Sequence, residues 1–473
     1  MTDAAARLSA LAEQALGAPL PVRLRAWDGS EAGPSDAPAL VLRSRRALQR
    51  LLWKPGELGL ARAYVSGDIL VEGDLYRALS LISGLVWERD DTQDRITTLR
   101  TAARAVGSLR DSSVRGALRE ALRLAGPALP PPPPPEEVRG RTGAPHTWGR
   151  DRAAISHHYD VGNPFYELVL GPSMVYSCAY WGEEAQTLED AQAAKLDLVC
   201  RKLALRPGDR LLDVGCGWGS MLLHAAEHYG VRALGITISQ EQAAYARKRV
   251  AAAGLTERIE IRVQDYRGLR PAVDGPFDAI SSIGMAEHVG AERFRVYTDQ
   301  LYSLLRDGGR LLNHQIARRP LPDERAYRLD PFIDRYIFPD GELSPVGATV
   351  GALEASGFEV RDVQTLREHY ALTLRAWVAN LEGRWEEAVK LVSPGRARAW
   401  RLYMAASALA FEGNRIGVNQ VLAVRTPVGG ASGMPLRRGG RYAEPVDTEP
   451  VATESVDAEP VDAEPADTEP AAG

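Results

Sequence analysis

Hydrophobic positions follow two alternating periods between residues 187 and 316. Apolar residues three or four apart predict helices, whereas short apolar runs bounded by turn residues predict strands. The expected elements are a helix over 187–205, a strand over 209–214, a helix over 220–229, a strand over 231–236, a helix over 239–253, strands over 258–264 and 277–283, a helix over 291–305 and a strand over 309–316. This order predicts an α/β fold, with a parallel sheet covered on both faces and ligands bound outside the carboxyl ends of its strands.

The first of these helices opens with TLED, in which Thr187 and Asp190 occupy capping positions. Helical spacing then places Leu196, Val199, Cys200 and Leu203 on one face. The Cys200 thiol is therefore expected in the core rather than in a reactive site.

Residues 1–125 show a different pattern. The extended stretch PVRLRAWDG is followed by GELGLARAYVSGDILVEGD, whose glycines separate short apolar runs, so a smaller α+β domain is expected. From Thr98 to Leu124 the pattern is helical, with arginines at positions 100, 104, 115, 119 and 123. Both a solvated helix face and a helix lying on a membrane surface fit this spacing.

Two segments of biased composition divide the chain. Pro130 to Pro135, followed by EEVRGRTGAP, predict a stiff linker over 126–150, because proline fixes φ and lacks an amide donor. The repeated EPVD and AEP units predict a disordered acidic tail over 426–473. The second folded domain then spans 151–425.

Composition and charge indicate where the protein acts and what kind of partner it binds. The 473 residues contain no apolar run of the roughly 20 needed to cross a bilayer, and the first residues lack the basic start of a secretory signal, so a cytoplasmic protein is expected. The three cysteines, at 178, 200 and 216, match no disulfide or metal-ligand pattern. The net charge is −5, but residues 444–473 hold ten acids and no base, so the rest of the chain carries +5. That balance favours an anionic partner such as a phospholipid surface.

The stretch LLDVGCGWGS predicts a loop that binds a nucleotide-like ligand. The strand ends at Asp213, and the glycines at 215, 217 and 219 allow a tight turn close to the ligand. Trp218 interrupts the GxGxxG spacing of dinucleotide enzymes, and the second strand ends at Thr237 instead of an acid. These departures favour S-adenosylmethionine over NAD.

Polar residues at the next strand ends complete this prediction. The side chains of Thr237, Ser239 and Gln242 can bond the ribose or the amino-acid part of the ligand, although Ser239 is equally suited to cap the following helix. In QDYRGL, Asp265 can meet the adenine amino group and Tyr266 can stack on the ring.

Several motifs, in this order, resemble the cyclopropane fatty acid synthases and the mycolic acid cyclopropane synthases. They are HHYDVGNPFYELVLGPSMVYSCAYW, LLDVGCGWG, GITIS, SIGMAEHVG, FIDRYIFPDGEL and REHYALTL, and the resemblance covers about residues 150 to 425. It implies a class I S-adenosylmethionine-dependent methyltransferase, Rossmann-like with a mostly parallel seven-stranded sheet. LARAYVSGD resembles the lipid-facing N-terminal domain of the phospholipid-acting members. Actinobacterial relatives that form 10-methylene fatty acids share these motifs, so the resemblance leaves the product open.

The resemblance also implies the site residues. A bicarbonate ion, acting as the base, would be held by Cys178, Glu287, His314, the backbone of Ile316, and Tyr370. The donor would be bound by Tyr176, Ser177, Gly215, Gly217, Thr237, Ile238, Gln242, Tyr266 and Ile283. Asp213 and Asp265 are added to this set from their positions at strand ends, not from the resemblance. Each catalytic residue also has a structural interpretation: Cys178 or His314 as a core residue, Glu287 as a helix-start carboxylate, and Tyr370 as packing beneath a helix over 371–381. His157 and His158 are expected to order their loop rather than to bind metal.

Chemistry explains why such residues are needed. An unactivated cis alkene is a poor nucleophile, so a sulfonium methyl group must be held in line with it in a dry pocket. Methyl addition leaves a carbocation, which the faces of Tyr176, Tyr180 and Trp181 could stabilise. Ring closure then needs a base near the cation.

Two positions depart from the family pattern. Ala286 stands in SIGMAEHVG where the family usually has Phe, and Asn313 stands where Leu is more frequent. Loss of a ring beside the pocket is expected to alter the shape available to the acyl chain.

The predicted function is methylation of cis-unsaturated phospholipid acyl chains to cyclopropanes, at the inner face of the membrane. The 10-methylene product is the main alternative, and C-methylation of a soluble small molecule and nonenzymatic lipid binding are two others. The expected partners are a phospholipid membrane surface and the unsaturated acyl lipid; nucleic acid is not among them, and a homodimer is left open.

Overall fold

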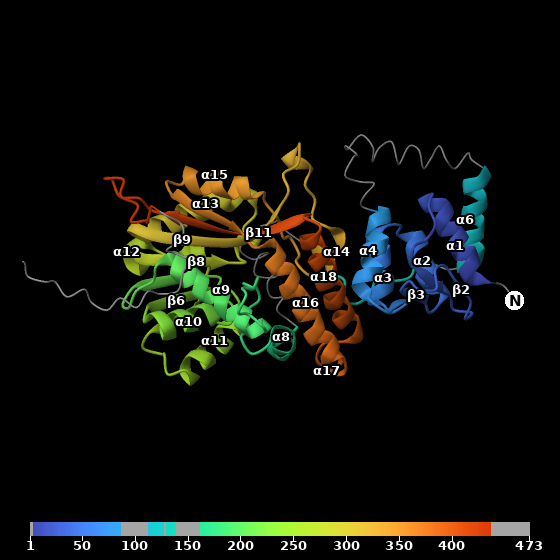
Figure 1. Cartoon of the computed structure of the whole chain (residues 1–473), viewed down its shortest axis with the longest axis horizontal. Helices are drawn as coiled ribbons and strands as arrows, with labels where there is room; N and C mark the ends of the chain where they lie inside the picture. Colours follow the sequence, from blue (N-terminus) through green and yellow to red (C-terminus); the bar gives the residue numbers. More distant parts are fainter. Residues whose placement is uncertain (1–2, 87–111, 127–128, 139–160, 437–473) are drawn as a thin grey trace, which may run out of the picture. The chain divides into compact units, whose positions relative to one another are not determined.

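A computed structural model describes residues 3–86, 112–126, 129–138 and 161–436 (Figure 1). The predicted pair His157 and His158, the first part of the helical pattern from Thr98, and most of the acidic tail lie outside these residues. Residues up to Met434 form one compact unit.

The N-terminal part contains the expected mixture of helices and strands. Its elements are α1 (Ala4–Leu16), β1 (Arg23–Arg25), β2 (Glu31–Ala32), β3 (Ala39–Leu42), α2 (Arg45–Trp53), α3 (Glu57–Val65), β4 (Ile69–Glu72), α4 (Leu75–Val86) and α6 (Ser112–Ala125). The strands form a small sheet in the order β2-β1-β3-β4, in which β1 and β3 are parallel. Buried apolar residues of α1, α2, α6 and the strands make its core.

The larger part contains a seven-stranded sheet with the order β10-β11-β9-β8-β5-β6-β7, which confirms the predicted fold class. Its strands are β5 (Arg210–Val214), β6 (Arg232–Thr237), β7 (Ile259–Val263), β8 (Phe277–Ile283), β9 (Leu305–Arg318), β10 (Glu359–Thr365) and β11 (Ile416–Val424). The strands from β9 to β7 pair in parallel, and β11 runs antiparallel to both of its neighbours.

Helices cover both faces of this sheet (Figure 1). One face packs against α9 (Leu188–Leu203), α10 (Ser220–Tyr229) and α11 (Gln240–Ala252), and the other packs against α13 (Ala291–Leu304) and α15 (Val346–Ala355). The remaining helices are α8 (Asn163–Leu170), α12 (Pro271–Asp274), α14 (Pro331–Tyr336), α16 (Arg367–Gly383), α17 (Trp385–Leu391) and α18 (Pro394–Glu412), with short 3-10 turns at Tyr266–Gly268, Ala286–His288 and Glu324–Ala326.

Local signals in the sequence explain these boundaries. Thr187 and Asp190 form a reciprocal capping box at the start of α9, and Cys200 is fully buried, as predicted. The strand expected over 309–316 begins earlier, at Leu305. Gly308, with φ +74°, lies within the strand beside an irregularity in its pairing with β8, so the glycines mark a bulge rather than a turn.

A third core lies where α8, α16 and α18 pack together. It contains Phe165, Trp377 and Trp400, and also Leu58 and Val65 of α3. The helices α16 to α18 fall between β10 and β11 in the sequence, so this insertion builds a helical layer at one end of the sheet.

The segment after the prolines is anchored to both parts. Glu137 is buried and its carboxylate accepts hydrogen bonds from Arg62 of α3 and from Arg335 and Tyr336 of α14. The predicted linker over 126–150 is therefore not only an extended spacer, because Glu137 within it is buried and hydrogen-bonded.

Candidate active site

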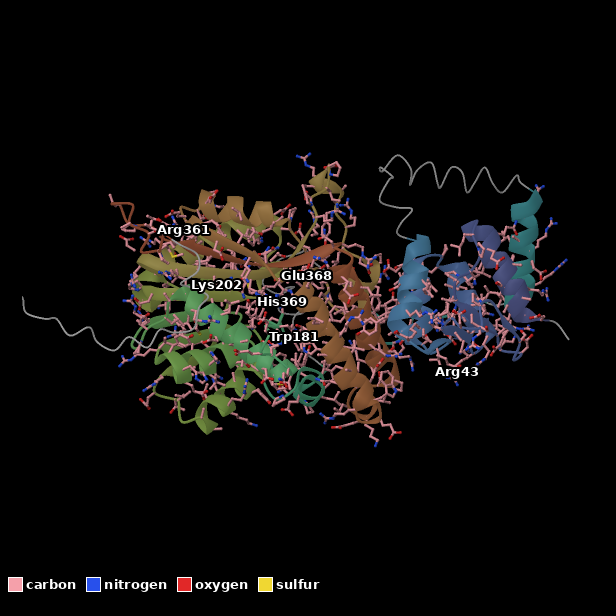
Figure 2. The ribbon with its side chains drawn as sticks, in the orientation of Figure 1. Arg43, Trp181, Lys202, Arg361, Glu368 and His369 are labelled. Carbon is pink, nitrogen blue, oxygen red and sulfur yellow. The ribbon has the colours of Figure 1, made fainter. Side chains whose placement is uncertain are left out.

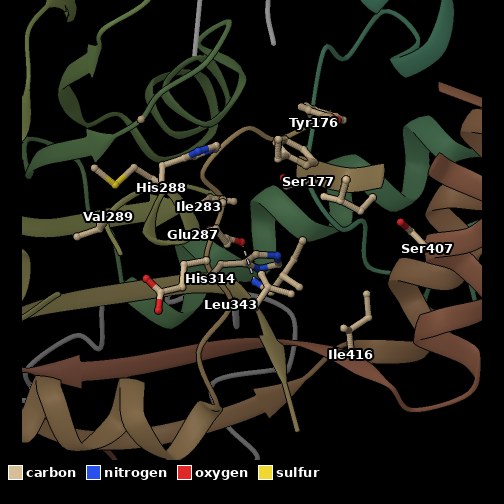
Figure 3. Close-up of a pocket in the computed structure, with 18 of the residues that line it drawn as sticks. Tyr176, Ser177, Ile283, Glu287, His288, Val289, His314, Leu343, Ser407 and Ile416 are labelled. Atoms are coloured by element: carbon tan, nitrogen blue, oxygen red, sulfur yellow. Dashed lines mark hydrogen bonds between the residues drawn. The ribbon is translucent and has the colours of Figure 1, made fainter. Parts of the chain in front are cut away.

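A cavity of about 1600 Å³ opens at the carboxyl ends of the central strands (Figure 3). It is lined by all but one of the residues predicted for donor binding and catalysis: Tyr176, Ser177, Asp213, Gly215, Gly217, Thr237, Ile238, Gln242, Asp265, Tyr266, Ile283, Glu287, His314, Ile316 and Tyr370. The exception is Cys178. A parallel sheet places these strand ends at one edge, which explains why Asp213 near the end of β5 and His314 on β9, about 100 positions apart, meet there.

The glycine loop after β5 turns as its sequence requires. Gly215 has φ +82°, and a Cβ placed there would lie 3.0 Å from the Cβ of Met285. The amides of Gly215 and Cys216 both donate to the carbonyl of Ile236, and the Arg249 guanidinium donates to the carbonyl of Trp218. The loop is thus fixed against β6 and α11 with its open side facing the cavity.

The polar groups at the end of β6 divide into two roles. The Thr237 hydroxyl donates to Oε1 of Gln242 at 2.8 Å, and both residues line the cavity. The Ser239 hydroxyl instead accepts from the amide of Gln242 as the cap of α11, so its structural interpretation is the correct one.

At the end of β7, Asp265 and Tyr266 lie on the cavity wall. The Asp265 carboxylate is already engaged by the amide and the guanidinium of Arg267. The Tyr266 ring is buried and packs edge-on against Tyr297. An adenine ring can lie beside this fixed tyrosine.

Asp213 ends β5 in a buried position. Its Oδ1 accepts a 2.6 Å hydrogen bond from the hydroxyl of Ser281 on the neighbouring strand β8. Burial raises the pKa of Asp213 to about 6, against the effects of Ser281 and Lys195, which lower it. The carboxylate is therefore mostly ionised at neutral pH and faces the ligand space.

Glu287 and His314 approach the cavity from two different elements (Figure 3). Glu287 lies in the turn after β8, and its Oε1 accepts a 2.8 Å hydrogen bond from the amide of Ile316. His314 and Ile316 project from β9 on the cavity side. Asn313 and Gln315 project from the opposite face, where they bond to one another.

Three polar atoms of this pair are buried without a hydrogen-bond partner: Oε2 of Glu287 and both ring nitrogens of His314. Burial raises the pKa of Glu287 to about 7 and holds the pKa of His314 well below its usual value. A carboxyl group close to half-protonated and a neutral imidazole can together donate to and accept from a small oxyanion. The donor and acceptor groups therefore fit the bicarbonate that the resemblance implies.

Tyr370 and Cys178 have different positions. Tyr370 lies in the first turn of α16, and its buried ring packs against Phe411 on the cavity wall, with ring centroids 4.7 Å apart. The Cys178 thiol is fully buried and points to the carbonyls of Ala179 and Leu366, away from the lining. Burial raises the pKa of this thiol. This geometry provides no contact of the thiol with the ion. It also leaves no free Ile316 amide for the ion, because that amide already donates to Glu287.

Comparison with known proteins decides the family. The family model for mycolic acid cyclopropane synthetase matches residues 146–421, more than half of the chain. The chain belongs to this family. A probable fatty acid methyltransferase of Mycobacterium tuberculosis is 43% identical over 88% of this chain and 94% of its own length. The cyclopropane-fatty-acyl-phospholipid synthase of Escherichia coli is 38% identical over 56% of this chain and 66% of that enzyme.

A solved structure gives the same result. The mycolic acid cyclopropane synthase CmaA1, complexed with SAH and CTAB, is 35% identical, with a TM-score of 0.54, over 58% of this chain and 98% of that chain. Membership of the cyclopropane synthetase family makes this chain an S-adenosylmethionine-dependent methyltransferase of fatty acyl chains. The family alone does not fix whether the product is a cyclopropane or a methyl-type branch.

The predicted aromatic group of this family member is only partly correct. Tyr176 lines the cavity and packs against Trp377 and Trp400, with ring centroids 5.4 and 5.9 Å away. Tyr180 instead stacks on His369, and the indole of Trp181 donates to Thr373. The backbone amide of Trp181 donates to the ring of His369; both residues are labelled in Figure 2. Neither ring lines the cavity. Aromatic faces from distant segments line it instead, among them Phe338, Tyr403 and Phe411.

The two departures from the family pattern also lie outside the cavity wall. Ala286 is buried in the core beneath the sheet, and the Asn313 side chain accepts from Tyr297 and donates to Gln315. The chain neighbours of Ala286, Met285 and Glu287, do line the cavity, and the effect of the shorter side chain at Ala286 on the space for the acyl chain stays a prediction.

Lys195 is the main wall residue that the sequence did not reveal. It lines the cavity from α9 and is almost fully buried. A lysine between apolar positions of a helix ordinarily indicates a solvated face. The available signal was its place in the sequence AAKLDLV, where the following Leu196, Leu198 and Val199 are core positions.

Proposed function

We propose that this enzyme transfers the methyl group of S-adenosylmethionine to the cis double bond of an unsaturated phospholipid acyl chain and closes the product to a cyclopropane. One observation carries the proposal. Oε2 of Glu287 and both ring nitrogens of His314 have no hydrogen-bond partner, and both residues line the same cavity as the glycine loop. Its volume of about 1600 Å³ exceeds the roughly 300–1,000 Å³ typical of a site for one small ligand, so it has room for a donor and an acyl chain.

The two ends of the cavity differ in chemistry. The donor end has the glycine loop, Asp213 and the Thr237–Gln242 pair. The other end is lined mainly by apolar side chains of α14, α16, α18 and β11, namely Phe332, Ile333, Leu374, Ala406, Ala410, Phe411 and Ile416. The hydrocarbon of an acyl chain can lie there while its double bond meets the donor methyl group between the two ends.

The residues between the ends explain the reaction. As the alkene carbon bonds to the methyl carbon, the bond from that carbon to the donor sulfur breaks, and the other alkene carbon becomes cationic. Tyr176 lines the cavity, and its ring would stabilise such a cation. Loss of a proton from the new methyl group then closes the ring. Bicarbonate, when bound between Glu287, His314 and Tyr370, would supply the base for that proton.

The hydrogen bond from the Ile316 amide fixes the orientation of Glu287. With one oxygen held, the second oxygen and the neutral His314 ring are left for the ion. The low pKa of His314 keeps this ring from carrying a charge that would repel the developing cation.

The N-terminal domain, which we place at residues 1–125, is proposed to dock on the phospholipid surface, with 126–150 as its linker and 151–425 as the methyltransferase domain. Helix α6 exposes Leu118 and Leu122 along with Arg115, Arg119 and Arg123. Leucines flanked by arginines suit the interface of an anionic membrane. No helix in the described ranges is long and apolar enough to cross a bilayer. Reversing the three arginine charges is expected to reduce binding to anionic liposomes, and unchanged binding would argue against this docking.

A 10-methylene product is the second candidate. Two relatives that match most of the chain, from Mycobacterium tuberculosis and Pseudomonas putida, are both named probable fatty acid methyltransferases, and that name fits either product. Both products lose a proton after methyl transfer, and they have the same mass.

Expression in a host that makes oleoyl phospholipid tests the proposal. Lipid mass spectrometry is expected to show an acyl chain one carbon heavier that resists ozone, because a cyclopropane lacks a double bond. An ozone-cleaved product would establish the 10-methylene alternative. Unmodified lipid, together with activity on a soluble substrate in the absence of vesicles, would favour a small-molecule C-methyltransferase.

A further inference from the structure

Lys195 places a buried positive charge on the wall of the cavity. Only 1% of the residue is exposed, and its Nζ donates a 3.1 Å hydrogen bond to the hydroxyl oxygen of Ser177. Both residues line the cavity beside Asp213 of the glycine-loop strand. None of the acidic groups in the part of the chain that the structure describes forms an ion pair with this ammonium group.

A buried ammonium group without a counter-charge destabilises the folded protein. The groups that interact with Lys195 electrostatically are Asp213, the thiols of Cys178 and Cys200, and the imidazole rings of His224 and His314. Burial raises the pKa of both thiols and lowers the pKa of both histidines, so all four groups stay neutral. Asp213 is the single acid in this set and lies beyond ion-pair distance. The ammonium group can therefore still pair with an anion that enters the cavity.

The direction of the Ser177 bond indicates where that anion lies. Because the serine oxygen accepts from Lys195, the serine proton is free to donate elsewhere, and Ser177 is on the cavity wall. Lysine and serine together present two donors, while Asp213 presents an acceptor. This arrangement of one cation, one hydroxyl and one anion complements an amino-acid zwitterion.

We infer that Lys195 is the counter-charge for the carboxylate of the amino-acid end of the donor, and that it orients Ser177 as the second donor to the same carboxylate. Asp213 faces the ammonium group of that amino acid. The inference rests on the proposed function, since it assumes that the donor lies in this cavity.

Binding of two donor fragments to purified protein tests this role. S-adenosylhomocysteine carries the amino-acid carboxylate, and 5′-methylthioadenosine lacks the amino-acid end. In Lys195→Met, calorimetry is expected to show about a ten- to hundred-fold loss of affinity for S-adenosylhomocysteine, the value of a hydrogen bond to a charged group. Affinity for 5′-methylthioadenosine should stay within about two-fold of the wild type. Lys195→Arg, which keeps the charge, is expected to recover part of the loss.

Lys202→Met is the matched control. Lys202 is also buried on α9, but its Nζ donates to Gln420 and it does not line the cavity. Lys202→Met should leave the ratio of the affinities for S-adenosylhomocysteine and 5′-methylthioadenosine unchanged. If Lys195→Met does not fold, Ser177→Ala gives the second measurement, with a smaller loss that is again confined to S-adenosylhomocysteine.

Three results would overturn the inference: equal loss of both ligands in Lys195→Met, no loss of either, or a changed requirement for added bicarbonate with S-adenosylhomocysteine binding intact. The last would assign the charge to the small oxyanion instead. Wild-type protein that fails to bind S-adenosylhomocysteine would contradict the proposed function itself, so the two failures are distinguishable.

Discussion

The backbone amide of Ile316 donates a 2.8 Å hydrogen bond to one carboxylate oxygen of Glu287 and thereby joins the turn after β8 to the strand β9. This bond fixes a carboxyl group whose other oxygen is buried without a partner, next to a histidine with two unpaired nitrogens. The site is thus held in place by the backbone while its remaining polar atoms stay available.

Glu287→Gln is expected to retain the hydrogen bond from Ile316 and to lose product formation by at least about a hundred-fold, in the range expected for a group that assists proton transfer. Binding of S-adenosylhomocysteine, measured by calorimetry, should be unchanged. Glu368→Gln is the matched control, because Glu368 is exposed on α16. Substantial turnover in Glu287→Gln would show that this carboxyl group is not needed to hold the bicarbonate base.

The pH dependence of stability follows from the raised pKa of Glu287. The ordinary value is 4.5 and burial raises it to about 7, so between these values the folded protein holds a proton that the unfolded chain has released. This contribution to stability is complete below about pH 4.5 and is lost as the pH rises through about 7. It amounts to at most about 3 kcal/mol.

Glu287→Gln cannot ionise, so it should gain thermal stability relative to the wild type between pH 5 and pH 8. The measurement is the difference in unfolding midpoint between the two proteins, without added bicarbonate. A difference that is constant across this range would mean that the Glu287 carboxyl group titrates near its ordinary value.

Gly215→Ala is expected to weaken donor binding by about a hundred-fold or more. A Cβ at this position requires a strained φ of +82° and contacts the Met285 side chain at 3.0 Å, which displaces the loop from the ligand. Gly254→Ala is a suitable comparison, since Gly254 also has a positive φ of +70° but has open space around it. It should cost about 1 kcal/mol of stability and leave donor affinity alone. Equal effects of the two variants would mean that strain, not loop position, governs binding.

Glu137 is expected to be important for stability. Its side chain is 1% exposed and bonds to Arg62, Arg335 and Tyr336, so Glu137→Gln leaves two guanidinium groups with a neutral partner. Breaking a buried ion pair costs about 3–5 kcal/mol, and the unfolding midpoint should fall by several degrees. Glu72→Gln, which removes an exposed partner of Arg25, should cost no more than about 1 kcal/mol. Similar midpoints for both variants would rule out a structural role for this cluster.

Much of the methyltransferase domain could be predicted because its signals are local. Alternating periods gave the strands and helices from α9 to β9, and the carboxyl ends of parallel strands share an edge, so Asp213, Thr237 and Tyr266 could be assigned to one ligand without knowing the packing. The family motifs extended this to Glu287, His314 and Tyr370, which the structure brings to the same cavity.

Other features depend on packing that no local pattern encodes. Tyr180 and Trp181 follow Tyr176 closely in the sequence, but their orientation is set by His369 and Thr373 of α16, almost 200 positions later. Helical spacing alone could not assign a role to Lys195. That role depends on its hydrogen bond to Ser177 and on the cavity that both residues line. The burial of Glu137 likewise depends on Arg62 and Arg335, which come from opposite sides of the prolines.

The most direct test of the central claim uses purified protein, vesicles of dioleoyl phosphatidylglycerol and S-adenosylmethionine with a fully deuterated methyl group. We predict that lipid mass spectrometry will show an acyl chain carrying one added carbon with two of the three deuterium atoms, resistant to ozone. The same product should be absent with Glu287→Gln and His314→Ala, although both variants bind S-adenosylhomocysteine. A wild-type protein that binds S-adenosylhomocysteine but leaves the acyl chains unchanged, or variants that form the product at the wild-type rate, would contradict the account.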